Sequence, residues 1–180
     1  MLRVLIADDE SKVCQLIEKL VDWDVLGMEV VAVAENGIEA LEKIKEFHPD
    51  IVITDIRMPG YDGLDLIRLG KEEAPKAEFV IISGYRHFEY AQMAIRYGVN
   101  AYLLKPIRKD ELTETLKRLS AHFKEQTEQL SLEEKRQRAI RSDEKNLRQA
   151  FLQDLVGRRN KEVLTQPLDR INREFHYHFE

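Results

Sequence analysis

Acidic, hydroxyl and basic side chains end or directly follow four of five short apolar segments in the sequence. They are Asp8, Asp9, Asp55, Ser83 and Lys105. Carboxylates that lie close together repel one another unless a cation neutralises them, and a hard divalent ion such as Mg²⁺ prefers oxygen ligands. A carboxylate beside magnesium is a candidate nucleophile toward phosphorus, while a hydroxyl and an ammonium group can share the charge of the transferred group. These residue types therefore predict a magnesium-dependent site for phosphoryl transfer.

Each of these side chains also has a purely structural explanation. Residues 8–11 are of types that favour the first turn of a helix. Asp55 could be a loop acid before a Met-Pro-Gly turn, Ser83 a turn former and Lys105 a solvated base. No single residue decides between the two explanations. One phosphate site accounts for all of them together, so the functional interpretation is favoured.

The five apolar segments must be strands of one sheet if these side chains are to meet. They are rich in valine and isoleucine and span residues 3–7, 29–34, 51–54, 79–83 and 101–104. Their largely continuous apolar character is typical of parallel strands covered by helices on both faces. The pattern predicts an α/β fold with a doubly wound parallel sheet and right-handed crossovers. Ligands of such sheets bind outside the carboxyl ends of the strands.

Helical spacing fills the segments between the predicted strands. One predicted apolar face consists of Val13, Leu16, Ile17, Leu20 and Val21, and another of Ile38, Leu41, Ile44 and Phe47. The single cysteine, Cys14, is expected in the first of these helices near the edge of the core. Because it is the only cysteine, it excludes an internal disulfide and fits a reducing cytosol.

From Glu111 onward no strong strand pattern returns. Apolar residues recur with alternating steps of four and three, the spacing of a coiled-coil seam; they are Leu112, Leu116, Leu119, Phe123, Leu130, Ile140, Leu147 and Phe151. We expect one continuous helix that pairs two copies of the chain. Because the seam is polar between about residues 131 and 146, the alternative is a helix ending near Phe123, a charged joint and a separate helix over 143–156.

Charge and hydropathy restrict the partners. Of the formal net charge of −5, residues 1–104 contribute −8 and residues 105–180 contribute +3. The acidic first part argues against nucleic acid as its direct ligand, and the second part is too weakly basic to predict DNA binding. No apolar run is long enough to span a bilayer, and no secretory signal is visible, so we expect a cytoplasmic protein.

Three stretches carry a resemblance to a known family. VLIADDE, DIVITDIRMPGYDGLDLI and FVIISGYRHFEYAQMAIRYGVNAYLLKPI, within about residues 2–122, resemble the receiver domains of bacterial two-component response regulators. The resemblance implies a CheY-like receiver domain over 1–122 with the flavodoxin-like strand order 2-1-3-4-5. A helical linker or partial middle region over 123–180 would follow. It also implies a signalling domain that catalyses only its own phosphorylation and dephosphorylation, not an enzyme.

The same resemblance implies roles for the acidic residues. Asp55 would be the phosphoacceptor, and the phosphoryl group would come from a sensor histidine kinase. Asp9 and Asp55 would bind Mg²⁺ directly, with Asp8 acting through water. The backbone carbonyl of Arg57 would be the third protein ligand of the metal.

The resemblance further implies a conformational switch. Lys105 would pair with the phosphate, and its peptide bond to Pro106 would be cis. The hydroxyl of Ser83 would move to the phosphoryl group while Tyr102 swings inward. The surface formed by the fourth helix, fifth strand and fifth helix of the pattern would then repack.

Arg57 and Tyr85 are expected to influence the lifetime of the phosphorylated form. They lie two residues beyond the acceptor and the hydroxyl, where side chains flank the approach of hydrolytic water. Both are large, which predicts slow self-hydrolysis.

The segment SGYRHFEYAQMAIRYGVNAYLLKPI is similar in sequence to the receiver domains of the subclass of regulators that have an AraC-type output. Residues 147–180 resemble the helical middle region of that subclass, and no recognition helix follows, so we expect a truncated chain. Transcriptional control and DNA binding would then belong to a longer parent protein. A homodimer is expected through the surface of the fourth helix, fifth strand and fifth helix, through the C-terminal helix, or through both.

Two alternatives compete with this interpretation. Enzymes of the haloacid-dehalogenase kind also combine an aspartate nucleophile with magnesium. Their nucleophile opens the chain in a DxD pattern, however, which Asp8-Asp9-Glu10 does not offer. The other alternative is a stand-alone module for phosphorylation-dependent protein interaction or dimerisation that does not bind DNA.

Overall fold

A five-stranded parallel sheet forms the centre of the fold. The computed structural model describes residues 1–84 and 88–157, and some side chains of the later helices are not described. The strands are β1 (Leu2–Ala7), β2 (Met28–Ala34), β3 (Ile51–Asp55), β4 (Glu78–Ser83) and β5 (Ala101–Leu104). They pair in parallel in the order β2-β1-β3-β4-β5. The predicted doubly wound α/β fold and its strand order are therefore confirmed.

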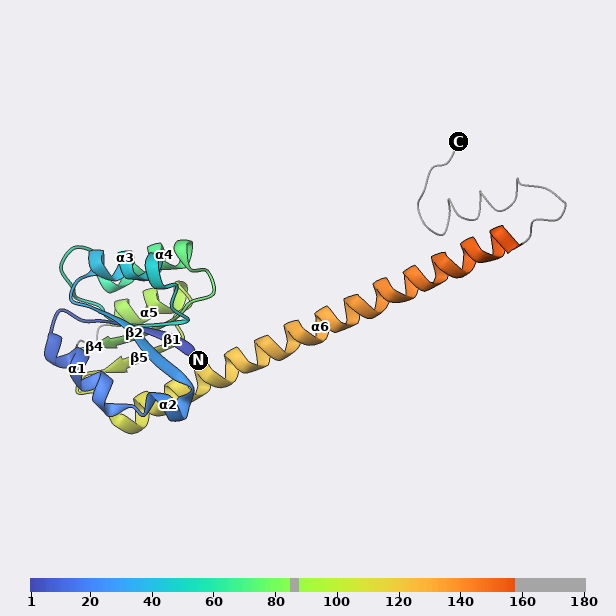
Figure 1. Cartoon of the computed structure of the whole chain (residues 1–180). Coiled ribbons are helices and arrows are strands. Elements are labelled where there is room, and N and C mark those ends of the chain that lie inside the picture. The colour runs from blue at the N-terminus through green and yellow to red at the C-terminus, as the bar shows by residue number, and fades with distance from the viewer. Residues whose placement is uncertain (85–87, 158–180) are drawn as a thin grey trace. The chain divides into compact units, whose positions relative to one another are not determined.

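Helices cover both faces of the sheet (Figure 1). They are α1 (Ser11–Leu20), α2 (Trp23–Leu26), α3 (Gly37–Phe47), α4 (Gly63–Glu73), α5 (Phe88–Arg96) and α6 (Lys109–Gly157). One core cluster joins the sheet to α1 and the beginning of α6, and the other joins it to α3, α4 and α5. The four-residue α2 was not predicted. It begins after Asp22, whose side chain accepts a hydrogen bond from the Val25 N–H, and it ends at Leu26, before Gly27 with its positive φ of 68°.

The predicted helix faces were only partly correct. Leu16 is 45% exposed and Ile38 is 52% exposed, although both were assigned to apolar faces. Cys14 and Ile17 of α1 are buried, so the buried stripe of α1 runs through these two positions and leaves Leu16 on its solvent side. Cys14 was expected near the core edge and lies within the core. Burial raises the pKa of its thiol to about 11.

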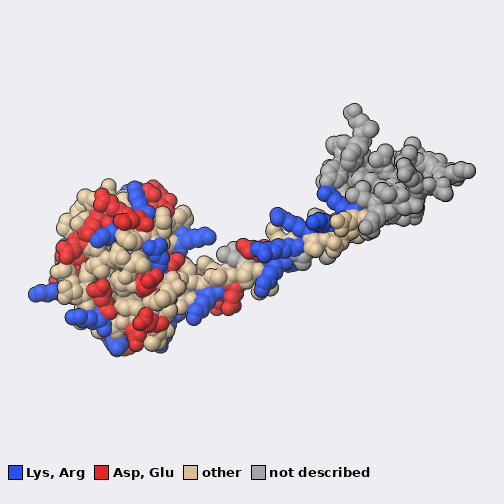
Figure 2. Space-filling model, in the orientation of Figure 1, with Lys and Arg blue, Asp and Glu red and all other residues tan. Residues whose placement is uncertain are grey.

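The last helix is continuous in the structure. It runs from Lys109 to Gly157 through the polar stretch of the predicted seam, as our preferred interpretation expected. Its first turns contribute buried leucines, among them Leu112 and Leu116, to the core. Farther along, Leu132, Ile140 and Leu147 are exposed, and Figure 2 shows acidic and basic side chains on this part of the helix. Pairing of two helices remains a prediction.

The chain divides into two compact units, residues 1–127 and 128–180. The assignment of residues 1–122 as the receiver domain and 123–180 as a linker or partial middle region stays a prediction. None of the helices in the described part of the chain is both long and apolar enough to cross a membrane.

Candidate functional site

The carboxyl ends of four neighbouring strands bring the predicted residues together. Ala7 is in register with Thr54, Asp55 with Ile82, and Ser83 with Leu104. The residues at or just beyond these positions therefore lie at one edge of the sheet. Lys105 extends from the end of β5 across this edge: its Nζ lies 2.8 Å from Asp8 Oδ2 and 2.8 Å from Asp55 Oδ2.

Three carboxylates surround one small volume. One oxygen each from Asp8, Asp9 and Asp55 lies within 4.8 Å of the others. Asp8 and Asp55 are buried, whereas Asp9 is exposed. Backbone amides orient the two buried groups: the Glu10 N–H donates to Asp8 Oδ1 at 3.0 Å, and the Ile56 N–H donates to Asp55 Oδ1 at 2.5 Å. The three acids can thus act together on one ligand.

The charge of this acidic group is only partly balanced. Burial raises the pKa of Asp8, although Lys105 and the Glu10 amide act in the opposite direction. Burial alone would lower the pKa of Lys105, but its hydrogen bond to Asp55 and its contact with Asp8 outweigh that effect and raise it. Lys105 therefore stays protonated at neutral pH.

The donor set fits a hard divalent cation. Asp8 Oδ2 is buried and touches Lys105 Nζ, but it has no donor aligned for a hydrogen bond. Lys105 supplies a single positive charge to the three aspartates, so their buried carboxylates still gain from a further cation. Oxygen atoms from Asp8, Asp9 and Asp55 are the ligand type that Mg²⁺ prefers.

Two glycines hold the loop after Asp55 in place. The Gly63 N–H donates to the Ile56 carbonyl at 2.7 Å, and a Cβ added to Gly63 would lie 2.1 Å from the Asp55 carbonyl oxygen. The Gly37 N–H donates to the Pro59 carbonyl at 3.0 Å, and an added Cβ there would lie 2.0 Å from the Tyr61 carbonyl oxygen. The starts of α3 and α4 therefore approach this loop more closely than any side chain would permit.

The remaining predicted residues are distributed as follows. Ser83 is fully buried at the end of β4, and the Lys105–Pro106 bond is cis as expected. Tyr102 lies partly buried in β5 and packs against the core cluster of α3, α4 and α5. Arg57 is exposed. Tyr85 lies outside the described residues.

Sequence reasoning missed two contributors to the site. Glu10 Oε1 lies 3.7 Å from Lys105 Nζ, yet Glu10 was considered as part of a helix start and of the Asp8-Asp9-Glu10 run and was given no role at the site. Gly63 was not among the predicted site residues. The run of three acids at 8–10 was the available signal for Glu10, whereas no local pattern indicates the close contact of Gly63 with Asp55.

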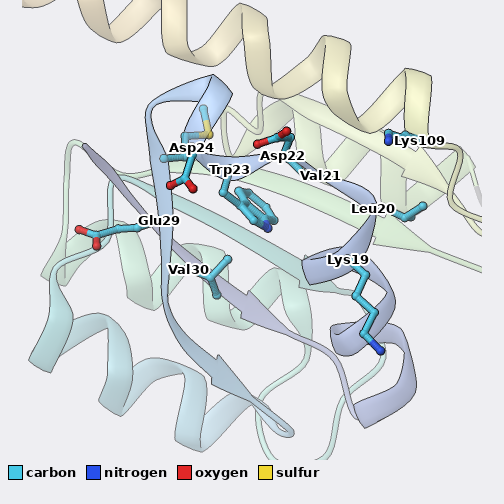
Figure 3. Close-up of a pocket in the computed structure, with 10 residues that line it drawn as sticks. Lys19, Leu20, Val21, Asp22, Trp23, Asp24, Glu29, Val30 and Lys109 are labelled. Carbon is cyan, nitrogen blue, oxygen red and sulfur yellow. The ribbon is translucent and has the colours of Figure 1, made fainter.

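A separate hollow of about 560 Å³ contains none of these residues. Figure 3 shows its lining, from the end of α1, from α2, from the start of β2 and from Lys109. The charged lining residues are Lys19, Asp22, Asp24, Glu29 and Lys109. The reactive groups at the strand ends therefore do not lie in this hollow.

Comparison with known proteins agrees with this geometry. The family described as "Response regulator receiver domain" matches residues 4–117. The transcriptional regulatory protein YesN of Bacillus subtilis (strain 168) is 41% identical over 126 residues, which cover 70% of this chain and 34% of YesN. HptR of Staphylococcus aureus (strain N315), also named a transcriptional regulatory protein, is 36% identical over 72% of this chain and 50% of its own length.

Solved structures show the same fold. The REC domain of AraT, a response regulator from Geobacillus stearothermophilus, is 40% identical with a TM-score of 0.67 and covers 70% of this chain and 98% of that one. A DNA-binding response regulator of the LuxR family from Staphylococcus aureus is 29% identical with a TM-score of 0.59; the match covers 67% and 99% of the two chains. This chain spans about a third to a half of the length of the curated relatives described above.

Proposed function

This chain belongs to the family of response regulator receiver domains, and on that premise we propose that Asp55 accepts a phosphoryl group from a sensor histidine kinase in a magnesium-dependent reaction. The domain is a signalling module of a two-component system. The observation that carries the proposal is the position of Lys105 Nζ, 2.8 Å from both Asp8 Oδ2 and Asp55 Oδ2. An ammonium group there is within reach of a phosphoryl group attached to Asp55.

Asp9 and Asp55 would hold the magnesium ion directly, Asp8 would hold it through water, and the backbone carbonyl of Arg57 would complete the protein ligands. When bound, the ion supplies positive charge to the oxygens of the transferred group. The mutual proximity of the three carboxylates and the buried Oδ2 of Asp8 support this assignment.

In the transfer itself, a carboxylate oxygen of Asp55 forms the new bond to phosphorus. The bond from phosphorus to the donor nitrogen of phosphohistidine breaks, and its electron pair leaves with the imidazole. Asp55 acts as an anion, so it has no proton to lose. Lys105 neutralises charge on the phosphoryl oxygens, and the Ile56 N–H orients Asp55 through its hydrogen bond to Oδ1.

The switch would then pass from Ser83 and Tyr102 to the surface of α5, β5 and α6. Because the pattern predicted from the sequence lacks the short helix α2, its fourth and fifth helices correspond to α5 and α6 of the structure. Relatives named as transcriptional regulators favour transcriptional output in a longer protein over a stand-alone interaction module. A homodimer through this surface or through α6, with DNA contacted only by a further C-terminal domain, belongs to the same proposal.

The chain is expected to gain the mass of one phosphoryl group when incubated with acetyl phosphate and Mg²⁺. A chelator should abolish the gain because the aspartates then lack their counter-ion. Magnesium should also raise the melting temperature, and an ion present at 100 times its Kd would stabilise the fold by about 2.7 kcal/mol. Intact-mass spectrometry and thermal melting measure the two effects. Steady hydrolysis of small phosphate esters, without a labelled protein, would instead support the dehalogenase-like alternative.

The phosphorylated form is expected to hydrolyse slowly, over minutes or longer. Arg57 is exposed two residues beyond the acceptor, where a large side chain obstructs the approach of water. Intact mass recorded at intervals after removal of the donor measures the half-life. Arg57→Ala should shorten it, and a wild-type half-life of seconds would contradict the expectation.

A further inference from the structure

We propose that Glu10 is a specificity-determining residue that slows phosphorylation of Asp55 by small, doubly charged phosphodonors. The inference rests on the proposed function, since it concerns the rate at which Asp55 is phosphorylated. It assigns a role to a side chain outside the aspartates, the hydroxyl and the lysine described above.

The backbone of Glu10 fixes its position at the site. Glu10 is the residue before the first turn of α1, where it adopts an extended conformation with φ −94° and ψ 98°. Its N–H donates to Asp8 Oδ1 at 3.0 Å, and its carbonyl accepts from the Val13 N–H at 2.8 Å. The residue is thus anchored both to the acidic group and to the helix.

The side chain of Glu10 does not cap the helix. Serine, threonine, aspartate and asparagine are preferred at this position because their short side chains reach the free amides of the first turn. The Glu10 side chain makes no such hydrogen bond, and its Oε1 lies 3.7 Å from Lys105 Nζ instead. Its carboxylate therefore faces the site.

Lys105 consequently meets three carboxylates with different exposure. The side chains of Asp8 and Asp55 are 2% and 10% exposed, whereas that of Glu10 is 67% exposed. Glu10 thus lies on the solvent side of the ammonium group, while the two aspartates lie on its buried side. A donor that approaches from solvent meets the Glu10 charge before it can pair with Lys105.

The consequence depends on the charge of the donor. Acetyl phosphate is a dianion near neutral pH, and phosphoramidate carries a lower net negative charge. When acetyl phosphate is the donor, the bond from phosphorus to the acetate oxygen breaks, and acetate leaves with the electron pair. When phosphoramidate is the donor, the bond from phosphorus to nitrogen breaks, and ammonia leaves with the electron pair. Asp55 forms the same bond to phosphorus in both reactions, so repulsion by Glu10 should separate their rates.

The test compares the full chain with Glu10→Gln, Glu10→Asp and Glu46→Gln, using both donors, Mg²⁺ and intact mass. We expect Glu10→Gln to accelerate labelling by acetyl phosphate about fivefold, which is the effect on the rate expected from removing one partly screened charge near the reacting group. Labelling by phosphoramidate should rise only about twofold, because half the net charge halves the repulsion energy and leaves the square root of the factor. Glu10→Asp keeps the charge, but its shorter side chain reaches the first-turn amides and can cap α1, so its labelling by acetyl phosphate should fall between wild type and Glu10→Gln. Glu46→Gln removes a charge from the exposed end of α3 and should change neither rate.

Salt distinguishes an electrostatic role from a structural one. In 1 M NaCl the Debye length is about 3 Å, so the difference in labelling rate between Glu10→Gln and the wild type with acetyl phosphate should largely disappear. An equal acceleration with both donors that persists in salt would overturn the proposal, as would no acceleration with acetyl phosphate. Failure of the wild type to be labelled, or equal labelling of Asp55→Asn, would instead overturn the proposed function and this inference with it.

Discussion

Replacement of Asp55 by asparagine is expected to reduce phosphorylation by acetyl phosphate and Mg²⁺ below detection. An amide oxygen is neutral and cannot form the acyl phosphate that a carboxylate forms. The variant should remain folded because asparagine has the same size and its side-chain oxygen can still accept the hydrogen bond from Lys105 Nζ. Intact-mass spectrometry measures the loss, and circular dichroism checks the fold.

Asp65→Asn is a suitable control for this variant. Asp65 is an exposed residue in the first turn of α4, where it pairs with Arg68 at 3.5 Å. The same chemical change at that position should leave labelling at the wild-type level, because a surface ion pair contributes little to stability. Labelling of Asp55→Asn to the wild-type extent would show that another residue is the acceptor.

Gly63→Ala is expected to destabilise the receiver unit by about 2–4 kcal/mol, an overpacking cost at or above the usual range. Alanine has the higher helix propensity, so a local argument would predict the opposite sign. The added Cβ, however, would lie 2.1 Å from the Asp55 carbonyl oxygen and 2.9 Å from the Ile56 Cα. Both are backbone atoms and cannot rotate away, so α4 or the end of β3 must move. Thermal or urea unfolding measures the change, and phosphorylation should slow because the movement includes Asp55.

Gly84→Ala provides the matched comparison. Gly84 is exposed, and among the residues that the structure describes an added Cβ there would meet no atom within 4 Å. Its free energy of unfolding should change by less than about 0.5 kcal/mol, the usual size for a surface substitution. If Gly63→Ala melted at the same temperature as Gly84→Ala, the close contact between α4 and Asp55 would be disproved.

The positions of the five strands could be predicted because their physical cause is local. Parallel strands buried on both faces need continuous apolar runs, and such runs were predicted within one residue of the observed ends. Convergence of the site followed from the same observation. All strands of a parallel sheet present their carboxyl ends at one edge, so Asp8, Asp55, Ser83 and Lys105 had to lie there.

The helices could be predicted less completely. Apolar periodicity indicated α1 and α3 but placed Leu16 and Ile38 on the buried face, because it does not show which part of an apolar stripe meets the sheet. The short α2 depends on the Asp22 cap and on the positive φ of Gly27, and its four residues are too few for a periodic signal.

The sequence by itself determined the strands, the edge at which they end and the chemical types of the residues placed there, since these depend on patterns within short segments. Only the tertiary structure decided that Lys105 Nζ contacts Asp8 and Asp55, that Glu10 turns toward it, and that Gly63 lies against Asp55. These contacts join residues far apart in the chain or depend on the direction of one side chain. They are set by how closely helices and loops pack against the sheet, which the local pattern of residues does not specify.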